Sequence, residues 1–113
     1  MNKDSKACIA YIAARAISGK LTTSVYDEER AAHINISGTV SATHAQVFDH
    51  IRGCHIQGHL MNLYDYGVGA HIKLNINGNT FSGYDYHSGV HFSGRVNGDN
   101  ICISANGFSN YSI

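Results

Sequence analysis

Four pairs of Asp and His recur along the chain, and these residue types are the ones best suited to chemistry. In each pair the Asp follows an aromatic residue and the His comes six positions after the Asp. The pairs are Asp27/His33, Asp49/His55, Asp65/His71 and Asp85/His91. A carboxylate that orients an imidazole occurs in catalytic triads and behind the ligands of metal sites.

Repetition of the pair argues against an active site, because catalysis needs one asymmetric constellation with a nucleophile and a pocket. We therefore expect the pairs to hold strand register on a solvated face, and we assign no catalytic residue. The alternative is a site for a divalent transition metal, whose ligands would be His55, His71, His91, Asp65 and Asp85.

The spacing within each copy predicts a β-hairpin. Gly69 comes five residues after Tyr64, and Gly89 five after Tyr84. We expect this Gly to occupy the left-handed position of a three-residue loop with a G1 bulge. That loop would pair Asp65 with His71, so that the Asp–His pairs face solvent and the tyrosines form the core. A two-residue loop would instead set Tyr opposite His.

Length and composition predict a single domain that is mainly β. The chain has 113 residues, 12 Gly, 7 Tyr and no Pro, with 43% hydrophobic and 14% charged residues, which favours short strands joined by tight turns. Copies begin near residues 26, 48, 64, 84 and 101. We expect about nine to ten antiparallel strands over 21–113, in meander order, curled into a barrel or a two-layer sandwich.

One amphipathic helix is predicted within 1–20, over residues 3–18. Its apolar stripe would pack across the tyrosine face of the sheet or plug one end of a barrel; a helix that binds a partner is the alternative. Asp4 or Ser5 would start the helix and Gly19 would end it. The stripe consists of Ile9, Ile12, Ala13, Ala16 and Ile17.

Two segments allow more than one interpretation. Residues 43–53 could form a helix or a hairpin, and the hairpin is favoured because Phe48-Asp49, Gly53 and His55 match the repeat. After Asn77-Gly78, a two-residue turn would place Phe81 on the core face and Tyr84 outside it. We therefore expect a longer loop, or a bulge near Ser82-Gly83.

The charge pattern excludes some partners and favours others. A formal charge of zero leaves no electrostatic footprint for nucleic acid or a membrane surface, and it favours self-association near neutrality. Eight His make the charge strongly pH-dependent.

Three Cys without a C-x-x-C spacing argue against a disulfide framework. The first residues lack the pattern of a signal peptide, so a cytoplasmic protein is the default expectation.

These observations favour a non-enzymatic structural or interaction module. We expect it to form homo-oligomers through its polar His-rich face, its strand edges or its helix, with no cofactor. The alternative is a β-domain that binds a metal through the Asp–His pairs, or a small ligand in a tyrosine-lined interior.

Overall fold

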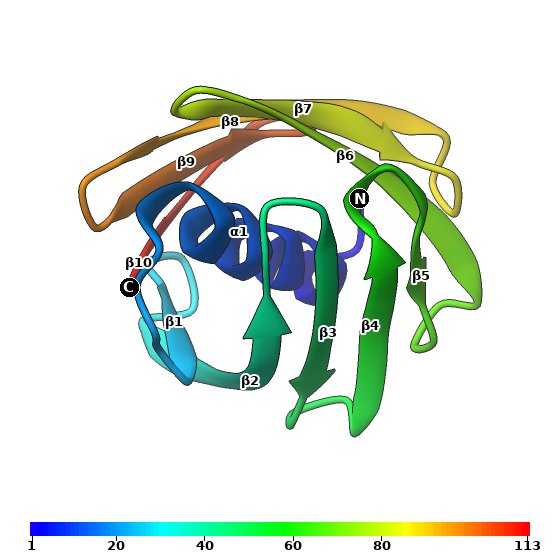
Figure 1. The fold of residues 1–113 in the computed structure, drawn as a ribbon, viewed down its shortest axis with the longest axis horizontal. Helices are drawn as coiled ribbons and strands as arrows, with labels where there is room; N and C mark the ends of the chain where they lie inside the picture. The colour runs from blue at the N-terminus through cyan, green and yellow to red at the C-terminus, as the bar shows by residue number, and fades with distance from the viewer.

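The computed structural model describes all residues, 1–113, as a closed ten-stranded barrel around one helix (Figure 1). The strands are antiparallel and follow one another in chain order, and β1 closes the barrel against β10. The prediction of a mainly β fold is confirmed, with the barrel as its form. The elements are α1 (Lys3–Ser18), β1 (Ser24–Asp27), β2 (Ala32–Val40), β3 (His44–Asp49), β4 (Cys54–His59), the 3₁₀ turn η1 (Leu60–Asn62), β5 (Leu63–Asp65), β6 (Ala70–Asn77), β7 (Thr80–Asp85), β8 (Val90–Asn97), β9 (Asn100–Ser104) and β10 (Phe108–Ser112).

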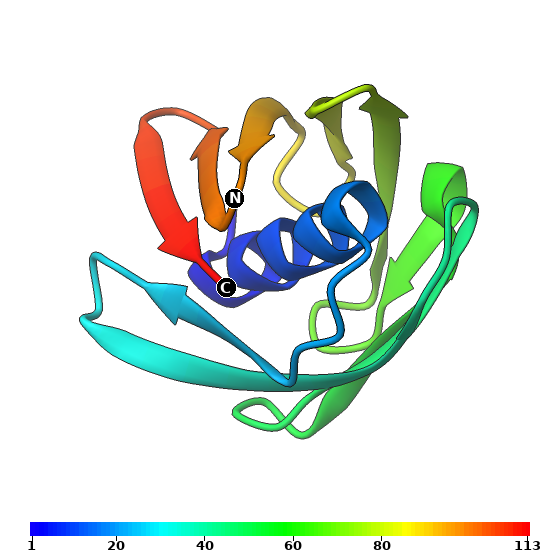
Figure 2. The ribbon, with the colours of Figure 1, turned by 60° about the vertical axis from the view of Figure 1, so that its left-hand side comes forward.

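Helix α1 runs through the interior of the barrel, enclosed by the strands (Figure 2). Its bounds are those predicted, but its first turn is capped by the side chain of Asn2, which accepts hydrogen bonds from Asp4 N and Ser5 N. Gly19 ends the helix in the left-handed conformation, at φ 72°. Every residue from Ala7 to Arg15 is buried. The expectation of one apolar stripe is therefore wrong, since a helix enclosed by a sheet must bury all its faces.

The core forms between α1 and the inward side chains of the strands. Four alanines of α1, together with its isoleucines, pack against aliphatic residues of the barrel wall. Small side chains allow a helix to fit inside ten strands. The helix thus fills the volume that a tyrosine-lined ligand cavity would have needed, and that prediction is wrong.

The repeated hairpins turn through four residues rather than three. Asp65 pairs with Ala70, and Asp85 with Val90. Each repeated Asp closes its own loop, because its Oδ1 accepts the backbone N–H two residues later, at 2.8 Å for Asp65 and 3.1 Å for Asp85. The left-handed conformation expected for the Gly is confirmed, with φ 70° at Gly69.

Because the loop has one residue more than predicted, each side chain before the turn lies on the opposite face of the sheet from the one expected. Tyr64 therefore pairs with His71, and both point outward, whereas Asp65 points inward and is fully buried. The predicted Asp–His pairing and tyrosine core are wrong in all four copies. The outward position of the histidines is as expected.

At the opposite ends of their strands, β6 joins β7 and β8 joins β9 through two-residue turns. Asn77 pairs with Thr80, so Phe81 and Gly83 lie on the core face without a bulge, contrary to the expectation. Phe81 pairs with Gly94, and Gly83 with Phe92. Each ring occupies the space where a Cβ on the opposite Gly would lie. Segment 43–53 belongs to the β3–β4 hairpin, which confirms the favoured interpretation.

Candidate functional site

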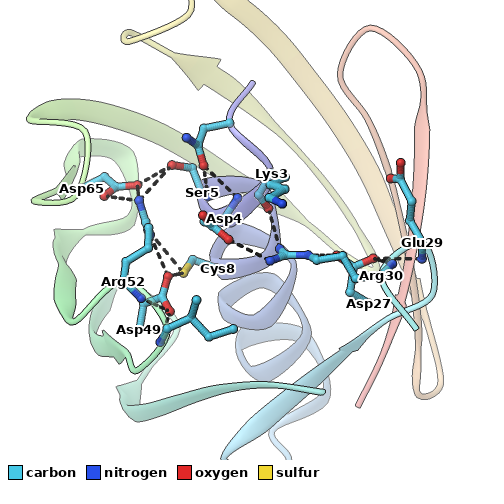
Figure 3. A network of polar contacts seen from close by, with 12 residues as sticks. Lys3, Asp4, Ser5, Cys8, Asp27, Glu29, Arg30, Asp49, Arg52 and Asp65 are labelled. Carbon is cyan, nitrogen blue, oxygen red and sulfur yellow. Dashed lines mark hydrogen bonds and ion pairs between the residues drawn. The ribbon is translucent and has the colours of Figure 1, made fainter. Parts of the chain in front are cut away.

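A buried polar network joins the first turns of α1 to the hairpin loops (Figure 3). Ser5 Oγ donates to Asp65 Oδ2 at 2.5 Å. Arg52, from the β3–β4 loop, donates through one terminal nitrogen to both oxygens of Asp65, at 3.0 and 3.2 Å. The same guanidinium donates through Nε to Asp49 Oδ2 at 2.7 Å. Two carboxylates therefore share one cation.

The thiol of Cys8 lies within this network. Its Sγ lies 3.5 Å from Asp49 Oδ2, and Arg52 lies 3.7 Å from it on the other side. Burial, assisted by the Asp49 carboxylate, raises the pKa of the Cys8 thiol well above its ordinary value. A thiol that stays protonated is a poor nucleophile, and Cys8 has no exposed surface.

The four copies differ in how the inward carboxylate is satisfied. Arg30 pairs with Asp27 at 2.6 Å and reaches Asp4 of α1 at 2.9 Å. Asp85 has no arginine in its loop, and its second oxygen accepts instead from Ser88 Oγ at 2.7 Å. The network therefore fixes the N-terminal end of α1 on one side of the barrel mouth. We interpret it as structural.

The outer wall carries the side chains that remain available to a partner. Each repeat places an aromatic ring against the histidine opposite it, with ring centroids between 4.6 and 4.9 Å apart. Two further tyrosines, Tyr66 and Tyr86, stand beside Tyr64 and Tyr84 at 4.7 and 4.8 Å. We call this set the aromatic–histidine band. Its pairs are Tyr26/His33, Phe48/His55, Tyr64/His71 and Tyr84/His91.

Charge is segregated across the barrel wall although the chain is neutral. All four carboxylates of the strands are buried inside, and the other acidic residues lie on the helix, in the β1–β2 loop or in the β8–β9 turn. The outward face of the strands carries Lys73, Arg95 and six exposed histidines, with no carboxylate. Neither composition nor net charge reveals this arrangement.

The residues predicted to bind a metal are separated by the wall. His55, His71 and His91 are exposed outside, whereas Asp65 and Asp85 are buried inside. No group of three or more His, Cys, Asp or Glu is placed to hold a metal ion. The prediction that these histidines and aspartates bind one metal ion together is therefore wrong, because they lie on opposite sides of the barrel wall.

One pair of histidine rings does meet on the wall. The rings of His44 and His59 lie 5.0 Å apart, centroid to centroid, at the ends of β3 and β4. His59 Nδ1 accepts the N–H of Met61 at 3.1 Å. In a neutral imidazole the proton then resides on Nε2, so the free edge of this ring presents a donor and not a metal ligand.

Comparison with protein-family models, with curated proteins and with solved structures finds no match. No helix of the structure has the length and apolar character required to span a membrane. The geometry of the outer wall and of the inner network therefore provides the basis for a functional proposal.

Proposed function

We propose that the protein is a non-enzymatic interaction module that associates with further copies of itself through the aromatic–histidine band. The exposure of this band is the observation that carries the proposal. Tyr66 and Tyr86 expose 56% and 60% of their surface. Tyrosine is enriched where protein surfaces bind, because it combines a large apolar ring with a polar tip.

The low charge of the wall at neutral pH favours contact between identical surfaces. At neutral pH its only permanent charges are Lys73 and Arg95, so two walls can approach with little electrostatic repulsion. Acid changes this balance, because histidine is the side chain that gains a positive charge in mildly acidic solution. Six histidines share that outward strand face with Lys73 and Arg95, and no carboxylate on it would compensate for added positive charge. We expect association at neutral pH and dissociation in acid.

Sedimentation velocity and light scattering over a concentration series test the proposal, at about pH 7.5 and about pH 5.5. We expect oligomers at the higher pH and monomers at the lower. Replacing both exposed tyrosines (Tyr66→Ser with Tyr86→Ser) should shift the neutral sample toward monomer. Leu21→Ser is the matched control, since Leu21 is 88% exposed but lies in the linker after α1.

Two results would contradict this function. If the wild-type protein is monomeric at neutral pH at every concentration of the series, it does not self-associate and the proposal is refuted. Oligomers that survive the double tyrosine substitution but are lost with Leu21→Ser would place the contact elsewhere. Circular dichroism of each variant verifies that the barrel is folded before its mass is interpreted.

A further inference from the structure

The outer face of β6 to β9 contains two shallow depressions that join. They share a floor of short polar side chains: Asn75, Ser82, Ser93 and Ser104. Lys73, Tyr84, Tyr86 and His91 border the first depression, and Arg95 and Phe108 border the second. No carboxylate lines either of them. The face is thus polar at its centre, aromatic at its edges and cationic on both sides.

Strand register arranges these residues in parallel rows across the sheet. Lys73, Tyr84 and His91 are cross-strand neighbours in one row. The four floor residues form the next row, and Arg95 lies in the third, beside Cys102. His91 and Arg95 are four residues apart on β8, which separates their backbones by about 13 Å. Cationic groups therefore flank the polar floor at a spacing that spans more than one sugar ring.

We propose that this face binds an acidic polysaccharide, a chain of sugar rings that bear carboxylate groups. Lysine, arginine and protonated histidine form charge-assisted hydrogen bonds with carboxylates. The hydroxyl and amide groups of the floor can both donate to and accept from sugar hydroxyls. The apolar faces of Tyr84 and Tyr86 offer surfaces for the C–H faces of the rings, as aromatic side chains do in ligand sites.

Other anionic partners fit this face less well. A protein binds a phosphate polymer tightly when many of its lysines and arginines contact the phosphates. Only Lys73 and Arg95 are permanently charged on this face. A bilayer surface is bound by polybasic or strongly apolar segments, whereas hydroxyl and amide groups form this floor. A polyhydroxylated chain with widely spaced carboxylates matches both the low charge density and the polar floor.

Binding should strengthen in acid. His91 is the imidazole at the edge of the floor; it faces Tyr84 from β7, and Lys73 lies beyond Tyr84 on β6. Asn106, after β9, borders the same depression, and Asp85 of β7 is buried on the other side of the wall. No carboxylate neutralises the added proton. Sugar carboxylates remain ionised at roughly pH 5.5, since carboxyl groups titrate near pH 4.

The test is calorimetric titration of the whole protein with polygalacturonate, with neutral dextran, single-stranded DNA and phosphatidylserine vesicles as comparison arms. We expect polygalacturonate to bind, several-fold more tightly at about pH 5.5 than at about pH 7.5. Dextran should not bind, and DNA and vesicles should bind more weakly than polygalacturonate. Lys73→Gln with Arg95→Gln should weaken polygalacturonate binding about tenfold. Gln46→Ala on β3, an outward polar residue outside this face, is the matched control.

Several outcomes would overturn the inference. The first is that polygalacturonate does not bind. The second is that DNA or the vesicles bind as tightly as polygalacturonate does. The third is that the double variant binds polygalacturonate like the wild type. The inference does not rest on self-association, because each titration, at either pH, is made at a protein concentration at which light scattering shows a monomer. Loss of polysaccharide binding would leave the assembly proposal intact, and a protein that is monomeric at neutral pH but binds the polysaccharide would refute only the assembly proposal.

Discussion

Ser5 Oγ donates a hydrogen bond of 2.5 Å to Asp65 Oδ2, and this contact joins the first turn of α1 to the third hairpin across 60 residues of chain. Asp65 also stabilises its own loop, because its other oxygen accepts a hydrogen bond from the N–H of Gly67 at 2.8 Å. A repeated residue that closes a turn thus also sets the position of the helix inside the barrel.

Loss of the Asp65 charge should destabilise the fold strongly. In Asp65→Asn the amide can still close the loop, but Arg52 loses one of its two carboxylate partners while remaining largely buried. Breaking a buried ion pair from one side costs about 3 kcal/mol. We expect a decrease of that size in the free energy of unfolding, measured in urea. Asp99→Asn is the control, because the Lys20–Asp99 pair is half exposed and such pairs contribute less than about 1 kcal/mol.

The loop of the first hairpin should become more stable when a glycine replaces its alanine. Ala31 has φ 52° at the position where the other copies carry a glycine. The left-handed conformation costs an ordinary residue about 1–2 kcal/mol, part of which glycine loses again in chain entropy. We expect Ala31→Gly to raise the free energy of unfolding by about 0.5 kcal/mol and Gly89→Ala to lower it by about 1 kcal/mol. Thermal melts should show that Ala31→Gly is more stable and Gly89→Ala less stable than the wild type. Changes in the same direction would contradict this explanation.

The interlocked Phe–Gly pairs predict a further stability effect. A Cβ at Gly94 would collide with the Phe81 ring and with the carbonyl oxygen of Cys102. Overpacking of this kind costs about 1–3 kcal/mol, so Gly94→Ala should unfold at lower urea concentration. Phe81→Leu should recover part of the loss in a double-mutant cycle. Ser93→Ala, on the outer face, should have little effect; additive losses in the cycle would show that the ring and residue 94 do not interact.

Alkaline pH should weaken the fold through Tyr111. Burial, together with the Asp27 carboxylate, raises the pKa of the Tyr111 phenol above its ordinary value. A pKa raised by folding means that the folded state holds the proton more tightly. The resulting stability is complete below about pH 10 and decreases as the pH rises above that value. Urea midpoints measured across this range should decrease less steeply in Tyr111→Phe, whereas Tyr66→Phe, at an exposed phenol, should behave like the wild type.

Much of the fold could be predicted from local signals. The predicted series of short antiparallel strands is present, the Asn77-Gly78 pair lies in a turn, and the Gly five residues after the aromatic adopts the left-handed conformation as expected. One signal in the helix was overlooked: residues 7–14 contain no charged or strongly polar side chain. An all-round apolar helix is a buried helix, and that pattern indicates enclosure by the barrel.

The sequence by itself determined the helix, the strands and the outward place of the histidines, because these depend on periodicity and on turn residues. The tertiary structure decided which side of the wall each aspartate and tyrosine occupies. A difference of one loop residue reverses both, and the choice depends on partners distant in the chain: Ser5 and Arg52 stabilise Asp65 inside the barrel. A buried carboxylate requires such partners, and only the closed barrel with its central helix brings them together.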